Sequence, residues 1–147
     1  MQGNHHAVHC AVYAILISDK KILLSLRKNT GWMDGCYGLP SGHVEESETL
    51  KSALVREVKE EIGLDIDETT LTFYHVMHRN KKAVGDRDHV DFYFKVEYWT
   101  GEPINTEPTK CDSIQWFDLD DLPDNIVPNV KVAIQYYRSK LIFSEFE

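Results

Sequence analysis

The sequence has few cysteines, little positive charge and no long apolar run, and each shortage excludes a class of protein. The three cysteines, Cys10, Cys36 and Cys111, are odd in number and widely spaced. This pattern argues against a disulfide framework or a zinc site and favours a reducing compartment, the cytoplasm. No apolar run reaches the roughly 18 residues of a membrane-spanning helix. The N-terminus lacks a basic segment followed by a clean apolar stretch, so we expect no signal peptide.

Positive charge is also scarce, with 16 Lys and Arg residues against 24 Asp and Glu residues and a formal net charge of −8. A nucleic-acid polymer is therefore a poor partner, because its phosphates need clustered cations. A small phosphorylated substrate is compatible with this charge if a metal cation mediates its binding. The 147 residues, without repeats or linkers, predict a single domain over residues 1–147, as a monomer or a homodimer.

Strand and helix patterns alternate along the chain. The periodicity of apolar residues and the positions of turn residues predict strands at 7–17, 21–26, 64–77, 89–99 and 113–119. The first two are joined by a tight turn at Ser18–Lys20, and loops are expected at 31–42, 79–88 and 101–112. Strands on both sides of a helix, with a second helix near the end, predict a mixed α/β fold in which helices pack on a sheet.

Two helices are predicted. The first covers 49–62, with Thr49 or Ser47 as its N-cap and Gly63 at the C′ position. The second covers 127–140, with four apolar residues expected on one face: Val130, Ile134, Tyr137 and Leu141.

The first helix carries an unusual number of acids on one side. A helical wheel separates an apolar arc, formed by Leu54, Val55, Val58 and Ile62, from an acidic arc. The acidic arc consists of Glu57, Glu60 and Glu61, whose i, i+3 and i, i+4 spacing lets the three carboxylates converge. Each like-charged pair costs about 0.2–0.5 kcal/mol, and the helix dipole disfavours anions in the last turn by about 0.3–1 kcal/mol each.

This acidic arc has two interpretations. It is either a solvated helix face, or one side of a pocket that holds a cation. Arg56 relieves Glu60 at i, i+4, but one guanidinium does not neutralise three acids. Converging carboxylates suit Mg²⁺ or Mn²⁺, and such ions usually complete their coordination with water and phosphate oxygens. The pattern therefore favours metal-assisted hydrolysis of a phosphoanhydride.

Residues 42–64 also resemble the Nudix box, the sequence motif of the Nudix hydrolase family. Every defining position of the motif matches: Gly42, Glu48, Arg56, Glu57, Val58, Glu60, Glu61, Gly63 and Leu64. The resemblance implies a mixed sheet between helices, with the box forming a loop–helix–loop. It also implies hydrolysis of a nucleoside diphosphate linked to another group.

The resemblance further implies a role for each matching residue. Glu57 and Glu61 correspond to the principal metal ligands, and Glu60 shares that role. The carbonyl of Gly42 corresponds to a backbone ligand, Arg56 orients the glutamates, and Glu48 supports the substrate site. In the lead-in to the box, Tyr37 stands where tryptophan is common and Ser41 replaces the first glycine of a pair. We expect activity to survive both departures, because Gly42 is retained.

The substrate is less well defined by the sequence. Members of the family that hydrolyse ADP-ribose or dinucleoside polyphosphates tend to carry a proline or a tyrosine at a window that here is Arg79–Lys82, and neither is present. A coenzyme-A-type motif is also missing. Residues 105–125 instead resemble MutT-like hydrolases of nucleoside triphosphates, in which Glu107 would activate water and Asn125 would contact the base. Alternatively, Glu107 is a surface acid and Asn125 a turn residue.

The expected function is therefore Mg²⁺-dependent hydrolysis of a nucleoside triphosphate, with oxidised purine nucleotides among the substrates, to a nucleoside monophosphate and pyrophosphate. Mn²⁺ would be an alternative cofactor. A first alternative is the same reaction on a nucleotide sugar or ADP-ribose. A second is a Nudix module that senses a nucleotide without cleaving it. Histidines on or beside strands, such as His9, His75 and His78, are expected to be packed or rim residues.

Overall fold

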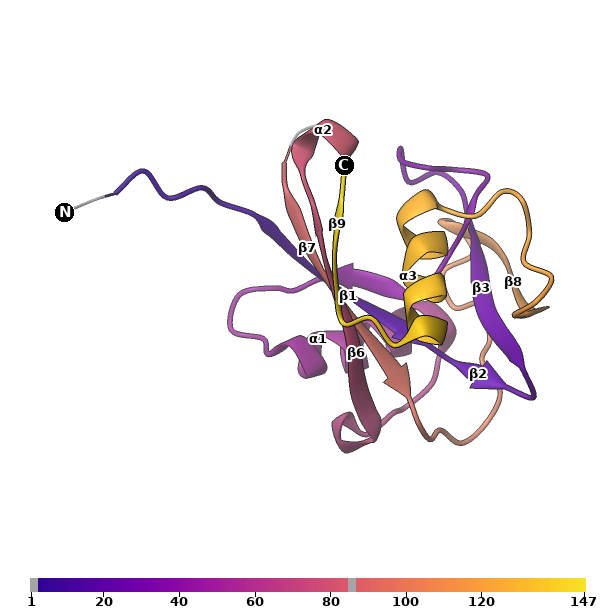
Figure 1. Cartoon of the computed structure of the whole chain (residues 1–147). Coiled ribbons are helices and arrows are strands. Elements are labelled where there is room, and N and C mark those ends of the chain that lie inside the picture. The colour runs from indigo at the N-terminus through magenta and orange to yellow at the C-terminus, as the bar shows by residue number, and fades with distance from the viewer. Residues whose placement is uncertain (1–2, 85–86) are drawn as a thin grey trace.

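A mixed five-stranded sheet forms the centre of the computed structural model, which describes residues 3–84 and 87–147 (Figure 1). Its strand order is β5-β1-β7-β6-β9. The strands are β1 (His9–Ile15), β5 (Ser41–His43), β6 (Leu71–Arg79), β7 (His89–Val96) and β9 (Phe143–Phe146). β1 runs parallel to β7 and antiparallel to β5, and β9 runs parallel to β6. β5 and β9 are therefore the two edges of this sheet.

A smaller antiparallel sheet lies beside it. Its strands are β2 (Ile17–Ser18), β3 (Lys21–Arg27), β4 (Tyr37–Gly38) and β8 (Cys111–Asp118), and β3 pairs with the other three. The predicted tight turn is present, since Asp19 and Lys20 both adopt positive φ between β2 and β3. β3 brings Arg27 to the end of this sheet.

The first helix agrees with its predicted bounds to within one residue. Helix α1 (Leu50–Ile62) begins after Thr49, whose hydroxyl accepts a hydrogen bond from the Ser52 backbone N–H. Gly63 ends the helix with a φ of 73°, a left-handed conformation that glycine adopts without strain. Of the two predicted caps, Thr49 is therefore the one used.

The two longer helices cover opposite faces of the central sheet. Alternate residues of β1 point to opposite sides, and Val12 and Ala14 pack with α1 residues such as Leu54 and Val58. Tyr13 and Ile15 of β1 point to the other side and pack with helix α3 (Pro128–Ser139). They lie in one core cluster with Val130, Ala133 and Ile134. The expected mixed α/β fold, a sheet sandwiched between helices, is confirmed.

Several predicted bounds were wrong. The strand expected at 64–77 begins only at Leu71, because Asp67 caps a short 3-10 helix, η1 (Glu68–Thr70), with its carboxylate. The expected loop at 31–42 contains β4 and β5. The expected loop at 79–88 contains a short helix, α2 (Lys81–Val84), and its positions 85 and 86 lie outside the described residues.

The C-terminal segment also differs from the prediction. Lys140 adopts a positive φ and ends α3, so Leu141 leaves the helix and its side chain is exposed. The following strand β9 was not predicted. Among the described residues, no helix is long and apolar enough to cross a membrane.

Candidate active site

A cavity of about 830 Å³ opens between β5, the acidic side of α1 and the loops of the smaller sheet. Its volume lies within the range of sites that bind nucleotide-sized ligands. Six residues predicted for the site line this cavity: Gly42, Arg56, Glu57, Glu60, Glu61 and Glu107. The structure therefore brings α1 and a distant loop to one place.

Glu57 lies against the backbone of β5. A Cβ atom added to Gly42 would overlap the Glu57 side chain, so only glycine leaves room for this carboxylate. Burial raises the pKa of Glu57, while the ion pair with Arg56 opposes that shift. The Glu57 carboxylate is thus held next to the backbone of Gly42, the two groups expected to bind metal together.

Arg56 holds the acidic side of the helix in place. Its Nε and Nη2 donate to both oxygens of Glu48, at 2.8 and 2.9 Å, and its Nη1 donates to Glu57 at 2.7 Å. A longer contact of 3.3 Å joins Nη1 to Glu60, and Nη2 also donates to the His43 carbonyl. The hydrogen bonds from Arg56 lower the pKa of Glu48 to about 2. One guanidinium therefore fixes three acids and the end of β5.

The carboxyl group of Glu61 has the most strongly raised pKa of the acids in the site. Burial raises its pKa to about 8, the neighbouring Glu57 and Glu107 add to the shift, and a hydrogen bond from the Ser41 backbone N–H opposes it at 3.0 Å. Ser41, one of the two departures from the family lead-in, thus contacts Glu61 through its backbone. Perturbed acids of this kind concentrate at functional sites.

The carboxylates are less tightly gathered than the helical wheel predicted. Among the described residues, they do not form a set of three ligand atoms within 4.8 Å of one another. Arg56 draws Glu57 and Glu60 toward itself, and the like charges repel one another. The three glutamates share the cavity, with Glu60 at its more exposed edge.

Glu107 reaches the cavity because its loop is anchored to α1. The Thr106 hydroxyl donates to the Glu60 carbonyl at 2.6 Å, and the Thr106 backbone N–H donates to the Glu61 carbonyl. The Asn105 side chain accepts from the Glu107 backbone N–H and donates to the Cys111 carbonyl. These bonds place a fourth carboxylate beside the helix, and the catalytic role that the resemblance implies for it stays a prediction.

Two predicted substrate-site residues lie elsewhere. Glu48 is engaged with Arg56 and does not line the cavity. The side chain of Asn125 donates to the Gly35 carbonyl at 2.9 Å, and its own carbonyl accepts from the Tyr37 backbone, again outside the lining. In this structure Asn125 therefore supports the loop before β4, and its contact with a base stays a prediction.

Sequence reasoning missed a cationic and aromatic part of the cavity. Two guanidinium groups lie over the ring of Trp32, that of Arg27 at 5.1 Å and that of Arg79 at 5.7 Å from the ring centre. Arg79 is almost fully buried and pairs with the buried Asp91. Arg79, at the start of the loop expected at 79–88, is instead the last residue of β6 and lines the cavity.

Comparisons with known proteins agree with this geometry. Residues 7–137 match the family model described as the NUDIX domain. An ADP-ribose pyrophosphatase of Methanocaldococcus jannaschii is 37% identical over 138 residues, which are 92% of this chain and 76% of that protein. An oxidized purine nucleoside triphosphate hydrolase of Mus musculus is 30% identical over 110 residues, 74% of this chain and 65% of that protein. A crystal structure of a MutT NUDIX hydrolase from Burkholderia pseudomallei superposes with a TM-score of 0.80 and 30% identity, covering 88% of this chain and 98% of the other.

Proposed function

This chain belongs to the Nudix family of hydrolases, which act on pyrophosphate bonds of nucleotide derivatives, and from that premise we propose a substrate and a mechanism. The substrate that we propose is a nucleoside triphosphate, with oxidised purine nucleotides included. The products are a nucleoside monophosphate and pyrophosphate, and the cofactor is Mg²⁺.

The residues of the cavity fit a hard divalent cation. Carboxylate and carbonyl oxygens are the ligands that Mg²⁺ prefers, and a few of them suffice because the ion keeps water and takes phosphate oxygens. Glu57 beside the Gly42 backbone and the buried Glu61 supply such oxygens. A cation would also offset the burial and mutual repulsion that raise the pKa of Glu61. We therefore assign Glu57, Glu60, Glu61 and the Gly42 carbonyl to the metal site.

Each protein residue has a defined task in the proposed reaction. Mg²⁺, when bound, would neutralise phosphate charge and polarise the phosphoryl group under attack. Arg56 keeps Glu57 in position through the 2.7 Å ion pair and is itself held by Glu48. Glu107 accepts a proton from the attacking water, whose oxygen forms a new bond to phosphorus as the bridging P–O bond breaks. The leaving phosphate group carries away the electron pair of that bond.

The position of Glu107 is the observation that favours a triphosphate. Its loop is anchored to α1 by Thr106, so the Glu107 carboxylate faces the helix acids at the cavity. The coulombic effect of Glu107 on the pKa values of Glu57 and Glu61 supports this closeness. A loop acid in this place is the feature by which the segment resembles MutT-like triphosphate hydrolases.

A second candidate substrate is ADP-ribose. The relative from M. jannaschii is named an ADP-ribose pyrophosphatase, and the cavity offers further polar groups beyond the carboxylates. Arg27, which lies over the Trp32 ring at the cavity, would bind a second phosphate. ADP-ribose would be cleaved to AMP and ribose 5-phosphate by the same residues.

The test is a side-by-side assay of the full chain with Mg²⁺ on dGTP, 8-oxo-dGTP, other nucleoside triphosphates and ADP-ribose, with products separated by chromatography. We expect the highest kcat/KM for a triphosphate, with monophosphate and pyrophosphate as products. A higher kcat/KM for ADP-ribose would establish the second candidate. Tight nucleotide binding without any Mg²⁺-dependent product would instead identify a sensing module.

A matched pair of variants tests the role of Glu107. Glu107→Gln should lower kcat for the triphosphate by about a hundredfold, the usual scale of general-base catalysis. Glu102→Gln is the control, because Glu102 lies in the same loop and is exposed. Equal activity of both variants would remove Glu107 from the mechanism.

We also propose a cytoplasmic location and a monomeric or homodimeric state. Cys10, Cys36 and Cys111 are all free thiols, and burial raises the pKa values of Cys10 and Cys111. Protonated thiols resist oxidation, which suits a reducing compartment. Cell fractionation and light scattering would test the two statements.

A further inference from the structure

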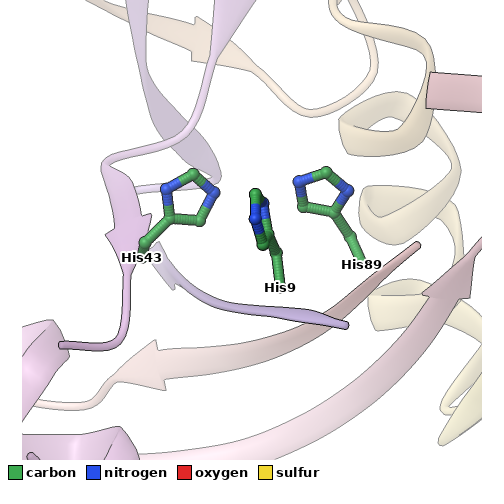
Figure 2. Close-up of side chains that lie close together, drawn as sticks. All are labelled: His9, His43 and His89. Atoms are coloured by element: carbon green, nitrogen blue, oxygen red, sulfur yellow. The ribbon is translucent and has the colours of Figure 1, made fainter. Parts of the chain in front are cut away.

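Three histidines from three different strands face one another at the edge of the cavity. Figure 2 shows His43 of β5, His9 of β1 and His89 of β7 side by side. One ring nitrogen from each lies within 4.8 Å of the other two. The ring centre of His9 lies 5.1 Å from the ring centre of His43 and 5.0 Å from the ring centre of His89. We refer to these residues as the histidine cluster.

The register of the sheet explains why the three rings meet. His9 pairs directly with His89 across the parallel β1 and β7 strands. His43 pairs with Ala11, which lies two residues beyond His9 and therefore on the same face of β1. The small side chain of Ala11 leaves room beside His43. The cluster is thus built into the sheet, on the face opposite the one that α1 covers.

The protonation of His89 suits metal binding. Its Nδ1 lies 3.1 Å from the Arg87 carbonyl and donates to it, which leaves the lone pair on Nε2. A backbone carbonyl bound to the second ring nitrogen is the usual arrangement behind a histidine ligand.

The surrounding charges permit a cation at this place. The nearby Arg79 is paired with the buried Asp91 through two hydrogen bonds, which offset part of its charge. Arg87 contacts His9 Nε2 at 3.3 Å, and a metal ion would displace it from that ring nitrogen. Arg87 is exposed, so its side chain can move into solvent.

We propose that His9, His43 and His89 form a site for a borderline transition-metal ion, Zn²⁺, Co²⁺ or Ni²⁺, with an open coordination position facing the cavity. Imidazole nitrogens suit such ions, whereas the carboxylate oxygens of α1 suit Mg²⁺. Tetrahedral Zn–N bonds of about 2.0–2.1 Å would bring the nitrogens to about 3.4 Å from one another. Rotation of the half-exposed rings supplies this movement. The proposal does not depend on the proposed function.

The experiment titrates Co²⁺ into the full chain in excess Mg²⁺, which occupies sites built from oxygen ligands. Visible absorption should show one equivalent of Co²⁺ bound to nitrogen ligands, and calorimetry should show one equivalent of Zn²⁺. His9→Gln, His43→Gln and His89→Gln should each weaken binding at least tenfold. The control is a His5→Gln, His6→Gln double variant, which removes two other histidines near the N-terminus and should leave binding unchanged.

Two further measurements keep the test decisive. Arg87→Ala should strengthen Co²⁺ binding several-fold, because it removes the competing contact to His9. Zn²⁺ should raise the melting temperature of the wild type and of the control, but not of the His43→Gln variant, whose exposed site allows folding. Binding that survives His43→Gln and His89→Gln, or that vanishes in the control, would overturn the proposal. So would the lack of saturable Co²⁺ binding by the wild type.

Discussion

The cavity is lined by two groups of side chains that could bind a metal ion. They differ in chemistry and in how the fold brings their members together. The glutamates of α1 lie within five consecutive positions, and helical periodicity alone places them on one side. The histidine cluster combines residues separated by 34 and 46 positions in the chain, and only strand pairing brings them together. Gly42 and His43 are neighbours in β5 but face opposite sides of the strand. Gly42 lies against Glu57 of the glutamate group, and His43 belongs to the histidine cluster.

The difference shows what kind of site a sequence reveals. A cluster built on one helix has a fixed spacing, so it is visible as a motif and can be matched to a family. A cluster built across strands has no fixed spacing, because the loops between the strands vary in length. The two groups also suit different metals, so a change in one should leave metal binding at the other intact.

The largest expected effect is that of Glu61→Gln. The neutral amide keeps the hydrogen bond from Ser41 but removes a negative charge from the proposed Mg²⁺ site. We expect kcat to fall about a thousandfold, or ~4 kcal/mol in activation free energy. Co²⁺ binding at the histidine cluster should be unchanged. Glu68→Gln is the control, because Glu68 is an exposed acid on η1. Full Mg²⁺-dependent turnover of Glu61→Gln would contradict the mechanism.

Gly42→Ala should have the next largest effect. The added Cβ overlaps Glu57, so the carboxylate must move away from the backbone of β5. We expect about a hundredfold loss of activity and a higher Mg²⁺ requirement, because several kcal/mol of metal assistance depend on this geometry. Gly38→Ala controls for folding, since its Cβ would meet neighbours only at 3.8 Å. Wild-type Mg²⁺ dependence in Gly42→Ala would exclude the close approach of Glu57 as a requirement.

Arg56→Lys tests the link between the two groups. Lysine has one point charge and cannot reproduce the paired bonds to Glu48, the bond to Glu57 and the bond to the His43 carbonyl. We expect about a tenfold fall in kcat/KM, the lower end of the range for residues that orient ligands. Co²⁺ affinity should change by less than about twofold. If both quantities fall together, the clusters are coupled through β5 and are not independent.

Local signals in the sequence accounted for much of the fold. The caps of α1 were predicted because a hydroxyl and a glycine act within one helical turn, and the β2–β3 turn for a similar reason. Long-range packing accounts for the misses. Leu141 leaves its helix because Lys140 turns the chain, and β9 forms only because the edge of β6 is available to it. Neither event has a local signal.

The site divides in the same way. Five residues of the Nudix box line one cavity together with Glu107: Gly42, Arg56, Glu57, Glu60 and Glu61. Their roles in metal binding and catalysis stay predictions. Trp32, Arg79 and the histidine cluster were missed, because their shared position depends on strand register and loop path. The pairing register of the strands cannot be inferred from a single sequence. These residues therefore form no recognisable sequence pattern.

His75 provides a contrast to the histidine cluster, because the protein uses both of its ring nitrogens. This buried ring donates from Nδ1 to the Leu141 carbonyl at 2.6 Å and accepts at Nε2 from the Ser144 hydroxyl at 2.8 Å. It therefore fastens β9 to β6 and has no lone pair left for a metal. Burial lowers the pKa of His75, and the hydrogen bond to Leu141 opposes that shift.

The lowered pKa of His75 predicts a pH-dependent loss of stability, the smallest of the four effects. The folded state binds fewer protons than the unfolded state once the pH falls below the ordinary histidine value of about 6.5, so the free energy of unfolding decreases with acidification. The contribution of one group is at most about 1.4 kcal/mol per pH unit. Urea unfolding between pH 7 and pH 5 should show a steeper loss for the wild type than for His75→Gln, and His75→Gln should bind Co²⁺ like the wild type. Identical slopes would show that His75 keeps its ordinary pKa, and weakened Co²⁺ binding would show that His75 is coupled to the histidine cluster.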